Sequence, residues 1–416
     1  MEKPQRVADS GQVGEEIPDS RRQGALGELA LFFLRLGFTA FGGPAAHIAM
    51  MEDELVRRRK WLSREKFLDL LGASSLIPGP SSSELAIHIG YLRGGWAGLV
   101  VGGCCFILPA AILVGIIAWA YVRFGQLPAA GAVLYGVKPV VIAVIVQALW
   151  GLGRTAVKTK LLGIVGVLCV ALSVLQVNLI LVLFGAGAAV ALLHSLLRRR
   201  PGKEIAAPLV LASSSRTMRL SLGRIFPWTT AAGSVGVAVA PGIWPLFLVF
   251  LRIGSIVFGS GYVLLAFLRA DLVAHRGWLT DSQLVDAVAI GQVTPGPVFT
   301  TATFIGYLLR GPVGALVATI GIFLPAFFLV AASGPLIPLI RRSGTAGAFL
   351  DGVNVASLAL MAVVSYQLGR SAIVDWLTTA LAIVSAVLLL RFKTNSAWLV
   401  LGGAVIGVAA RLLRGG

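Results

Sequence analysis

Residues 76–84 read LIPGPSSSE and residues 293–301 read VTPGPVFTT, and each stretch lies within a long apolar segment. Proline removes a backbone hydrogen-bond donor and clashes with the preceding helical turn, and glycine adds backbone freedom, so a Pro-Gly-Pro sequence is not continuous helix. The two Pro-Gly-Pro sequences are 217 residues apart. A repeated break of this kind indicates that the chain is duplicated.

The composition excludes an ordinary soluble enzyme. Of the 416 residues, 57% are hydrophobic and 13% are charged, whereas soluble proteins carry about 25% charged residues. Apolar runs of about 20 residues are long enough to cross the hydrocarbon core of a lipid bilayer. The sequence therefore predicts an all-α integral membrane protein with about 12–13 transmembrane or re-entrant segments.

The net charge of +17 does not indicate a nucleic-acid partner, because basic residues gather in the cytoplasmic loops of membrane proteins. A basic stretch rich in serine and proline divides the chain in two. We expect residues 1–24 to form a disordered cytoplasmic tail, 25–197 the N-terminal repeat, 198–227 a basic cytoplasmic linker and 228–416 the C-terminal repeat.

The second half repeats the first. Between residues 31–80 and residues 248–297, 17 of 50 aligned positions are identical. The loop 52–66 carries six basic residues, whereas its counterpart 269–283 carries two arginines. Because positively charged loops stay in the cytoplasm, this asymmetry favours an inverted repeat. Duplicated helical halves are typical of secondary transporters, which bind substrate between the repeats near the middle of the membrane.

The two breaks are candidates for an anion site. In lipid, broken backbone is tolerated where protein buries it or where it lines a cavity. A helix that begins after such a break directs its N–H groups and positive dipole end at the cavity, with hydroxyl groups beside them. A proline kink and ordinary N-capping by the serines remain alternatives. The candidate substrate-binding residues at the breaks are Pro78, Gly79, Pro80, Ser81, Ser82, Pro295, Gly296, Pro297 and Thr300.

Arg35 and Arg252 occupy equivalent positions inside apolar segments. An arginine within the membrane is costly and usually faces an interior cavity, and its planar fork of donors suits tetrahedral oxyanions. The alternative is an arginine that extends from a helix end to the membrane surface. A glycine-rich motif follows each arginine and completes the candidate set with Phe41, Gly42, Gly43, Pro44, Phe258 and Gly259.

Glu84 and His88 lie four residues apart on one helix face, where they form either a proton-coupling pair or a structural pair. No catalytic residue, metal site or cofactor is predicted, because the three cysteines lack metal-like or redox-like spacing and the chain has no phosphate-binding loop. An intramembrane enzyme that uses Ser260 as its nucleophile is a distant alternative, since no histidine partner is evident.

With these motifs the sequence resembles the chromate ion transporter family in its long-chain form with two homologous halves. The resemblance covers about residues 28–413 and rests on Phe41-Gly42-Gly43-Pro44, Trp61-Leu62, Pro78-Gly79-Pro80 and their counterparts Phe258-Gly259, Trp278-Leu279 and Pro295-Gly296-Pro297. It implies a multi-pass carrier of the bacterial plasma membrane that exports chromate, with sulfate as a competitor. The implied partners are chromate and the lipid bilayer, with a homodimer left open.

The sequence departs from this family at two places. Many members have a glutamine where this chain has Glu84, and Gly-Gly-Gly-His where it has the sequence GSGY at residues 259–262. A dianion that leaves an inside-negative cell gains about 4.6 kcal/mol per 100 mV, so we expect export driven by the membrane potential, with protons as an optional coupling ion. The alternative is a carrier of sulfate or another tetrahedral oxyanion.

Overall fold

The computed structural model describes residues 19–41, 43–125, 127–198, 241–258, 263–333, 343–392 and 394–413. Regular structure in these residues is helical, which agrees with the predicted all-α class. The predicted basic linker beyond Arg198 lies outside the described residues, as do Gly42 and Gly259. Of the predicted tail, residues 1–18 also lie outside them, whereas residues 19–24 belong to the first helix.

The two halves contain matching series of helices. The first half comprises α1 (Asp19–Thr39), α2 (Gly43–Glu52), η1 (Asp53–Arg58), α3 (Arg64–Ser74), α4 (Ser81–Phe124), α5 (Pro128–Ala156), α6 (Lys160–Val174) and α7 (Leu179–Arg198). The second comprises α8 (Ile243–Ile256), α9 (Leu264–Leu268), η2 (Arg269–His275), α10 (Asp281–Val293), η3 (Val298–Thr300), α11 (Thr301–Ser333), α13 (Gly344–Ala372), α14 (Trp376–Phe392) and α15 (Ser396–Leu413).

Local sequence signals fix where several of these helices begin. Ser63 caps α3 by accepting a hydrogen bond from the backbone N–H of Lys66. Its counterpart Thr280 forms a capping box with Gln283 at the start of α10. Such caps satisfy N–H groups that have no partner within the helix. The helices that precede the two Pro-Gly-Pro breaks are therefore equivalent down to their caps.

α4 and α11 are each a helical hairpin. The chain turns sharply at Gly95 (φ +59°, ψ −143°) and at Gly311 (φ +62°, ψ −153°), a conformation that glycine adopts readily. The two arms of α4 pack so tightly that a Cβ on Gly90 would lie 2.2 Å from the carbonyl oxygen of Gly98. Each hairpin therefore has a short arm that starts at the Pro-Gly-Pro break and a longer arm that runs back along it.

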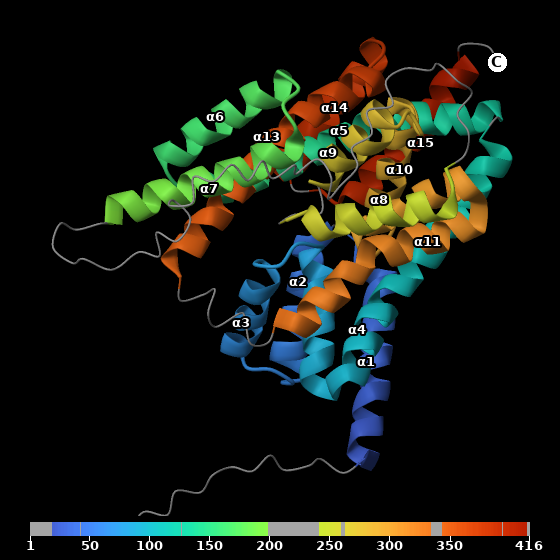
Figure 1. Ribbon diagram of the computed structural model, residues 1–416. Coiled ribbons are helices and arrows are strands. Elements are labelled where there is room, and N and C mark those ends of the chain that lie inside the picture. The colour runs from blue at the N-terminus through green and yellow to red at the C-terminus, as the bar shows by residue number, and fades with distance from the viewer. Residues whose placement is uncertain are drawn as a thin grey trace, which may run out of the picture.

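The two halves exchange their last two helices. α6 and α7 pack against α13 of the second half, and α14 and α15 pack against α5 of the first (Figure 1). Close glycine contacts allow both crossings: a Cβ on Gly352 would lie 2.6 Å from the carbonyl oxygen of Ala186, and a Cβ on Gly136 would lie 1.9 Å from that of Gly403. Gly136 and Gly352 are equivalent positions of the repeat. The two halves therefore pack against each other through equivalent, reciprocal contacts.

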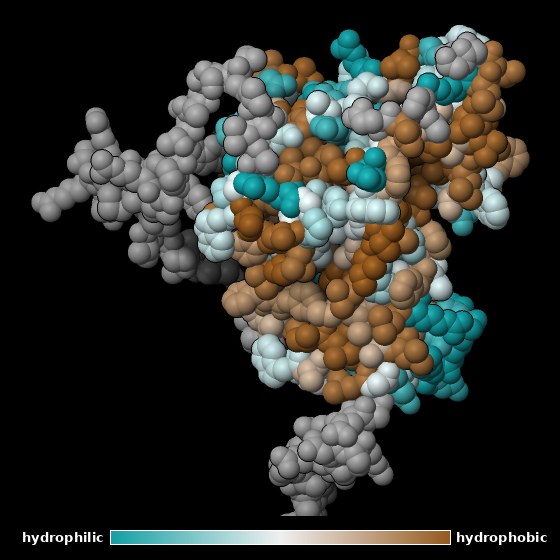
Figure 2. Space-filling view, turned by 90° about the vertical axis from the view of Figure 1, so that its right-hand side faces the viewer, coloured by the Kyte–Doolittle hydropathy of each residue, from teal (hydrophilic) through white to brown (hydrophobic). Residues whose placement is uncertain are grey.

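The protein is a multi-pass membrane protein. Within the described residues, α4, α5, α7, α11, α13 and α15 contain stretches that are long and apolar enough to cross a membrane. Hydrophobic residues cover the middle of the face shown in Figure 2, and hydrophilic residues gather toward its top and lower right. Large side chains such as Trp96, Trp150 and Phe328 are more than half exposed. A surface of this kind suits contact with lipid chains rather than water.

Candidate functional site

Each Pro-Gly-Pro break is hydrogen-bonded to the opposite half of the chain. The N–H of Gly79 donates to the carbonyl oxygen of Val257 at 2.7 Å, and the N–H of Gly296 donates to that of Ala40 at 3.0 Å. Val257 ends α8 and Ala40 follows α1, so each break meets the start of the other half's glycine-rich motif. Pro78 and Phe258 also form an isolated antiparallel bridge. The sequence predicted the two breaks but not that they pair across the halves.

A buried histidine of α2 links these elements. His47 is fully buried, with Nε2 at 3.1 Å from the carbonyl oxygen of Ala40 and Nδ1 at 3.3 Å from Oγ of Ser82. In the tautomer with the proton on Nε2, His47 donates to Ala40 and accepts from Ser82. The carbonyl of Ala40 thus accepts from both His47 and Gly296. This arrangement fixes the first turn of α4 relative to both breaks.

A cavity of about 400 Å³ lies between the halves beside the first break. Three of the predicted site residues line it: Pro44 of the first glycine-rich motif, Ser81 at the start of α4, and Phe258 of the second motif. The other lining residues come from α2, α3 and the residue after it, the end of α5 and the residues after it, the N-cap of α9, and α13. They are Ile48, Leu71, Ser75, Leu152, Thr155, Ala156, Lys158, Val263, Asp351, Asn354, Ser357, Leu358 and Met361.

The cavity combines apolar walls with a few polar groups. α4 begins at Ser81 without a side-chain cap, so its positive dipole end lies at the cavity wall. Lys158 Nζ lies 2.7 Å from Asp351 Oδ1 across the two halves. Ser357 is 2% exposed and its hydroxyl has no hydrogen-bond partner. These groups suit the oxygens of a small anion better than a metal ion.

The part of the chain that the structure describes holds no group of three or more His, Cys, Asp or Glu residues that could bind a metal ion. Of the cysteines, Cys169 is buried, and Cys104 and Cys105 are partly buried as free thiols in α4. The candidate site is therefore composed of proline, glycine, hydroxyl, amide and paired charged groups.

Glu84 lies against the first break. It is fully buried, neither carboxyl oxygen has a hydrogen-bond partner, and a Cβ on Gly79 would lie 2.3 Å from Glu84 Oε1. His88 is 6% exposed, and its Nε2 has no partner either. The two side chains therefore share a helix face without a hydrogen bond from these atoms to each other.

Thr300 and the second break are also buried. The Thr300 hydroxyl donates to the carbonyl oxygen of Pro297 at 2.8 Å, which closes the short η3 turn. Thr300 and residues 295–297 do not line the cavity that Ser81 lines. The two breaks are thus equivalent in backbone position but unequal in their access to this cavity.

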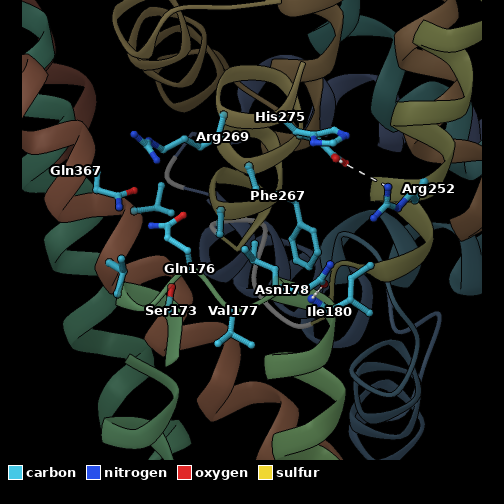
Figure 3. A pocket seen from close by; sticks show the side chains of 17 residues that line it. Ser173, Gln176, Val177, Asn178, Ile180, Arg252, Phe267, Arg269, His275 and Gln367 are labelled. Atoms are coloured by element: carbon cyan, nitrogen blue, oxygen red, sulfur yellow. Dashed lines mark hydrogen bonds and ion pairs between the residues drawn. The ribbon is translucent and has the colours of Figure 1, made fainter. Parts of the chain in front are cut away.

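The two predicted arginines lie in different surroundings. Arg35 is exposed on α1 and lines neither cavity. Arg252 lines a second cavity of about 300 Å³, which Figure 3 shows with Arg269 on another side of it. Arg252 Nη1 lies 3.8 Å from Asp271 Oδ1, and Arg269 makes two contacts of 2.8 and 3.2 Å to Asp281. Carboxylates therefore balance both arginines of the second cavity.

A buried polar cluster joins the halves elsewhere. Lys138 Nζ of α5 lies 3.1 Å from Asp286 Oδ1 of α10 and 2.6 Å from Ser282 Oγ. The hydroxyl of Tyr121 donates to Asp286 Oδ2 at 3.0 Å. The repeat counterpart of Lys138 is Asn354, which lines the larger cavity. The halves therefore differ in charge at the positions that face the opposite repeat.

Several residues of the larger cavity had no signal in the sequence. Lys158 and Thr155 stand near the end of an apolar segment, and Ser357 is one of many serines in apolar helices. Their proximity depends on how α13 crosses α5. The useful signal was the comparison of equivalent repeat positions, which singles out Asn354 opposite Lys138.

Two homologous helical halves, paired interrupted segments and a cavity between them define a membrane transporter. The family model described as "Chromate transporter" matches residues 27–192 and 244–408, one match in each half. The chain therefore belongs to the chromate transporter family, which is a family of transporters and not of enzymes.

Relatives match over most of their length. A chromate transport protein of Cupriavidus metallidurans is 34% identical over 387 residues, which cover 92% of this chain and 93% of that protein. A chromate transport protein of Pseudomonas aeruginosa is 32% identical over 342 residues, 81% of this chain and 80% of that protein. A probable chromate transport protein of Synechococcus elongatus is 31% identical over 370 residues, 87% and 89% of the two chains. No solved structure matches the chain.

Proposed function

We propose that this protein is a secondary carrier that exports chromate across the bacterial plasma membrane. The observation that carries the proposal is the cavity between the halves, which is lined by Ser81 after the first break and by Pro44 and Phe258 of the two glycine-rich motifs. Three relatives at 31–34% identity are named as chromate or probable chromate transport proteins. A helix N-terminus, a hydroxyl and an amide at this cavity suit an oxyanion.

The membrane potential supplies the driving force in this proposal. One charge that crosses 100 mV changes in free energy by about 2.3 kcal/mol, so the export of a dianion gains about 4.6 kcal/mol per 100 mV. Export therefore needs no bound nucleotide. Sulfate has the same charge and tetrahedral shape, and it is the alternative substrate.

The test is chromate flux into or out of proteoliposomes under an imposed potential, with sulfate as competitor. We expect saturable flux that reverses direction with the potential and shows counterflow. Absence of chromate flux from monodisperse protein would overturn the proposal. The Arg35→Ala variant belongs in the same assay, because a loss of flux would place this exposed arginine on the substrate path.

For chromate export that is coupled to proton movement, we propose Glu84 as the residue that carries the proton. A carboxylate that is fully buried without a partner is costly, so it holds a proton or a cation. The Glu84→Gln variant keeps the shape and removes the titratable group. We expect this variant to lose the pH dependence of chromate flux, and an unchanged pH profile would exclude coupling through Glu84.

We also propose that the two halves have opposite orientations in the membrane. An inverted repeat is supported by the unequal charge of loops 52–66 and 269–283. The basic loop and the linker would face the cytoplasm. Both halves of one chain line the cavity, so a homodimer would contain two separate sites.

A further inference from the structure

An ion pair between the halves closes part of the mouth of the larger cavity. Lys158 follows α5 of the first half, and Asp351 belongs to α13 of the second. The atoms Lys158 Nζ and Asp351 Oδ1 are 2.7 Å apart, and the two side chains are 60% and 34% exposed. Because both residues line the cavity and both reach the surface, the pair lies where the cavity opens.

Deeper in the cavity, polar groups are positioned to meet an anion. α4 starts at Ser81, where the positive end of its dipole points at the cavity wall. Asn354 also lines the cavity and supplies an amide. The Ser357 hydroxyl is buried without a hydrogen-bond partner, which is unfavourable unless a ligand oxygen meets it. Ser357 and Ser81 line the same cavity, so the unpartnered hydroxyl is a second, independent sign of a ligand there.

The charges that line the cavity cancel each other. Among the described residues that line it, Lys158 and Asp351 are the charged ones. A dianion needs an excess of positive charge, and Lys158 provides it only when Asp351 no longer holds the ammonium group. An ion pair as exposed as this one contributes little to stability, so it opens readily.

We propose that Lys158 is the cation that binds the oxyanion dianion, and that Asp351 is an internal counter-anion which the substrate displaces. The inference rests on the proposed function and adds two binding determinants to it. The incoming dianion takes the place of Asp351 on Lys158 Nζ, and Ser357, Asn354 and the N-terminus of α4 meet its other oxygens. Asp351 therefore lowers the affinity of the cavity for an anion by competing for Lys158.

The test measures the KM of potential-driven chromate flux with the full chain in proteoliposomes. We expect Asp351→Asn to lower KM on the order of fivefold, because Lys158 is then free for the substrate. We expect Lys158→Gln to raise KM about tenfold, because a charge-assisted contact is lost. Lys158→Arg keeps the charge and should retain a KM near that of the wild type. Opposite shifts in KM are the signature of exchange, since a merely structural pair would give shifts of the same sign.

Lys160→Gln is the matched control. Lys160 is exposed, lies two residues after Lys158 at the start of α6, and lines neither cavity. The KM of the Lys160→Gln variant should therefore equal that of the wild type. In the Lys158→Gln background, Asp351→Asn should no longer lower the KM, as expected when the two residues act as a coupled pair. If Lys158→Gln and Asp351→Asn raise the KM equally in monodisperse protein, the substrate does not displace Asp351 from Lys158. That result would overturn the inference and leave chromate export intact. Opposite shifts for sulfate in a protein that moves no chromate would support the exchange and overturn chromate export.

Discussion

Breaking the buried cluster around Lys138 and Asp286 should destabilise the protein measurably. The two side chains are 17% and 4% exposed, and their charged atoms lie 3.1 Å apart. Removal of one partner from a buried ion pair costs about 3–5 kcal/mol, because it leaves the other charge unpaired. For Asp286→Leu we expect a loss of about 3 kcal/mol, the lower end of this range, because Ser282 still contacts Lys138. At about 2.1 cal/mol/K per residue, 3 kcal/mol over 416 residues corresponds to a fall in Tm of about 3–4 °C.

The assay is thermal unfolding of the purified protein in detergent. The double variant Lys138→Met with Asp286→Leu removes both charges and should lose less stability than Asp286→Leu alone. The exposed pair of Arg58 and Asp53, with side chains 70% and 46% exposed, provides the control. Asp53→Ala should cost less than about 1 kcal/mol. If the double variant loses as much free energy of unfolding as Lys138→Met and Asp286→Leu lose together, the two residues do not act as a unit and the reasoning is refuted.

Three further outcomes can be checked. Gly79→Ala should lower flux strongly, because the backbone at Gly79 has φ +143°, which side chains rarely adopt, and the Glu84 carboxyl would have to move; normal flux would contradict a strained backbone at the break. Ser357→Ala should raise the KM for chromate about threefold to tenfold if its hydroxyl meets the substrate, and this is measured as initial flux. In a background without the three cysteines, Arg57→Cys and Ala274→Cys should react with an impermeant thiol reagent from opposite sides of the membrane, and labelling from one side would exclude an inverted repeat.

The sequence was sufficient for the class of fold and for the positions of the breaks. Proline and glycine act locally, so Pro78 to Pro80 and their copies predict an interruption whatever surrounds them. Periodicity and length predict membrane helices in the same local way. The boundaries between apolar runs, at residues 92–95 and 309–311, coincide with the turns at Gly95 and Gly311, whereas the sequence alone does not show that each turn closes a hairpin.

Contacts across the halves could not be predicted from local signals. The hydrogen bond from Gly79 to Val257 joins residues 178 positions apart, so it depends on how the two halves pack. Arg35 and Arg252 are equivalent in sequence, yet one is exposed on α1 and the other lines the second cavity beside Asp271. Duplication preserves backbone positions, whereas the surroundings of a side chain depend on every helix that packs against it.

The two repeats differ in the polar contacts that equivalent positions make with the opposite half. At one position Lys138 of the first half binds Asp286, and Tyr135 donates a hydrogen bond to Asp375. At the equivalent position of the second half, Asn354 replaces Lys138 and Asp351 replaces Tyr135, and here the larger cavity opens. The buried pair of Lys138 and Asp286 is harder to separate than the exposed pair of Lys158 and Asp351, so the two contacts between the halves differ in the free energy needed to break them. In the carrier proposed above, alternating access would require both contacts to break and re-form, so substrate binding would have to offset that difference.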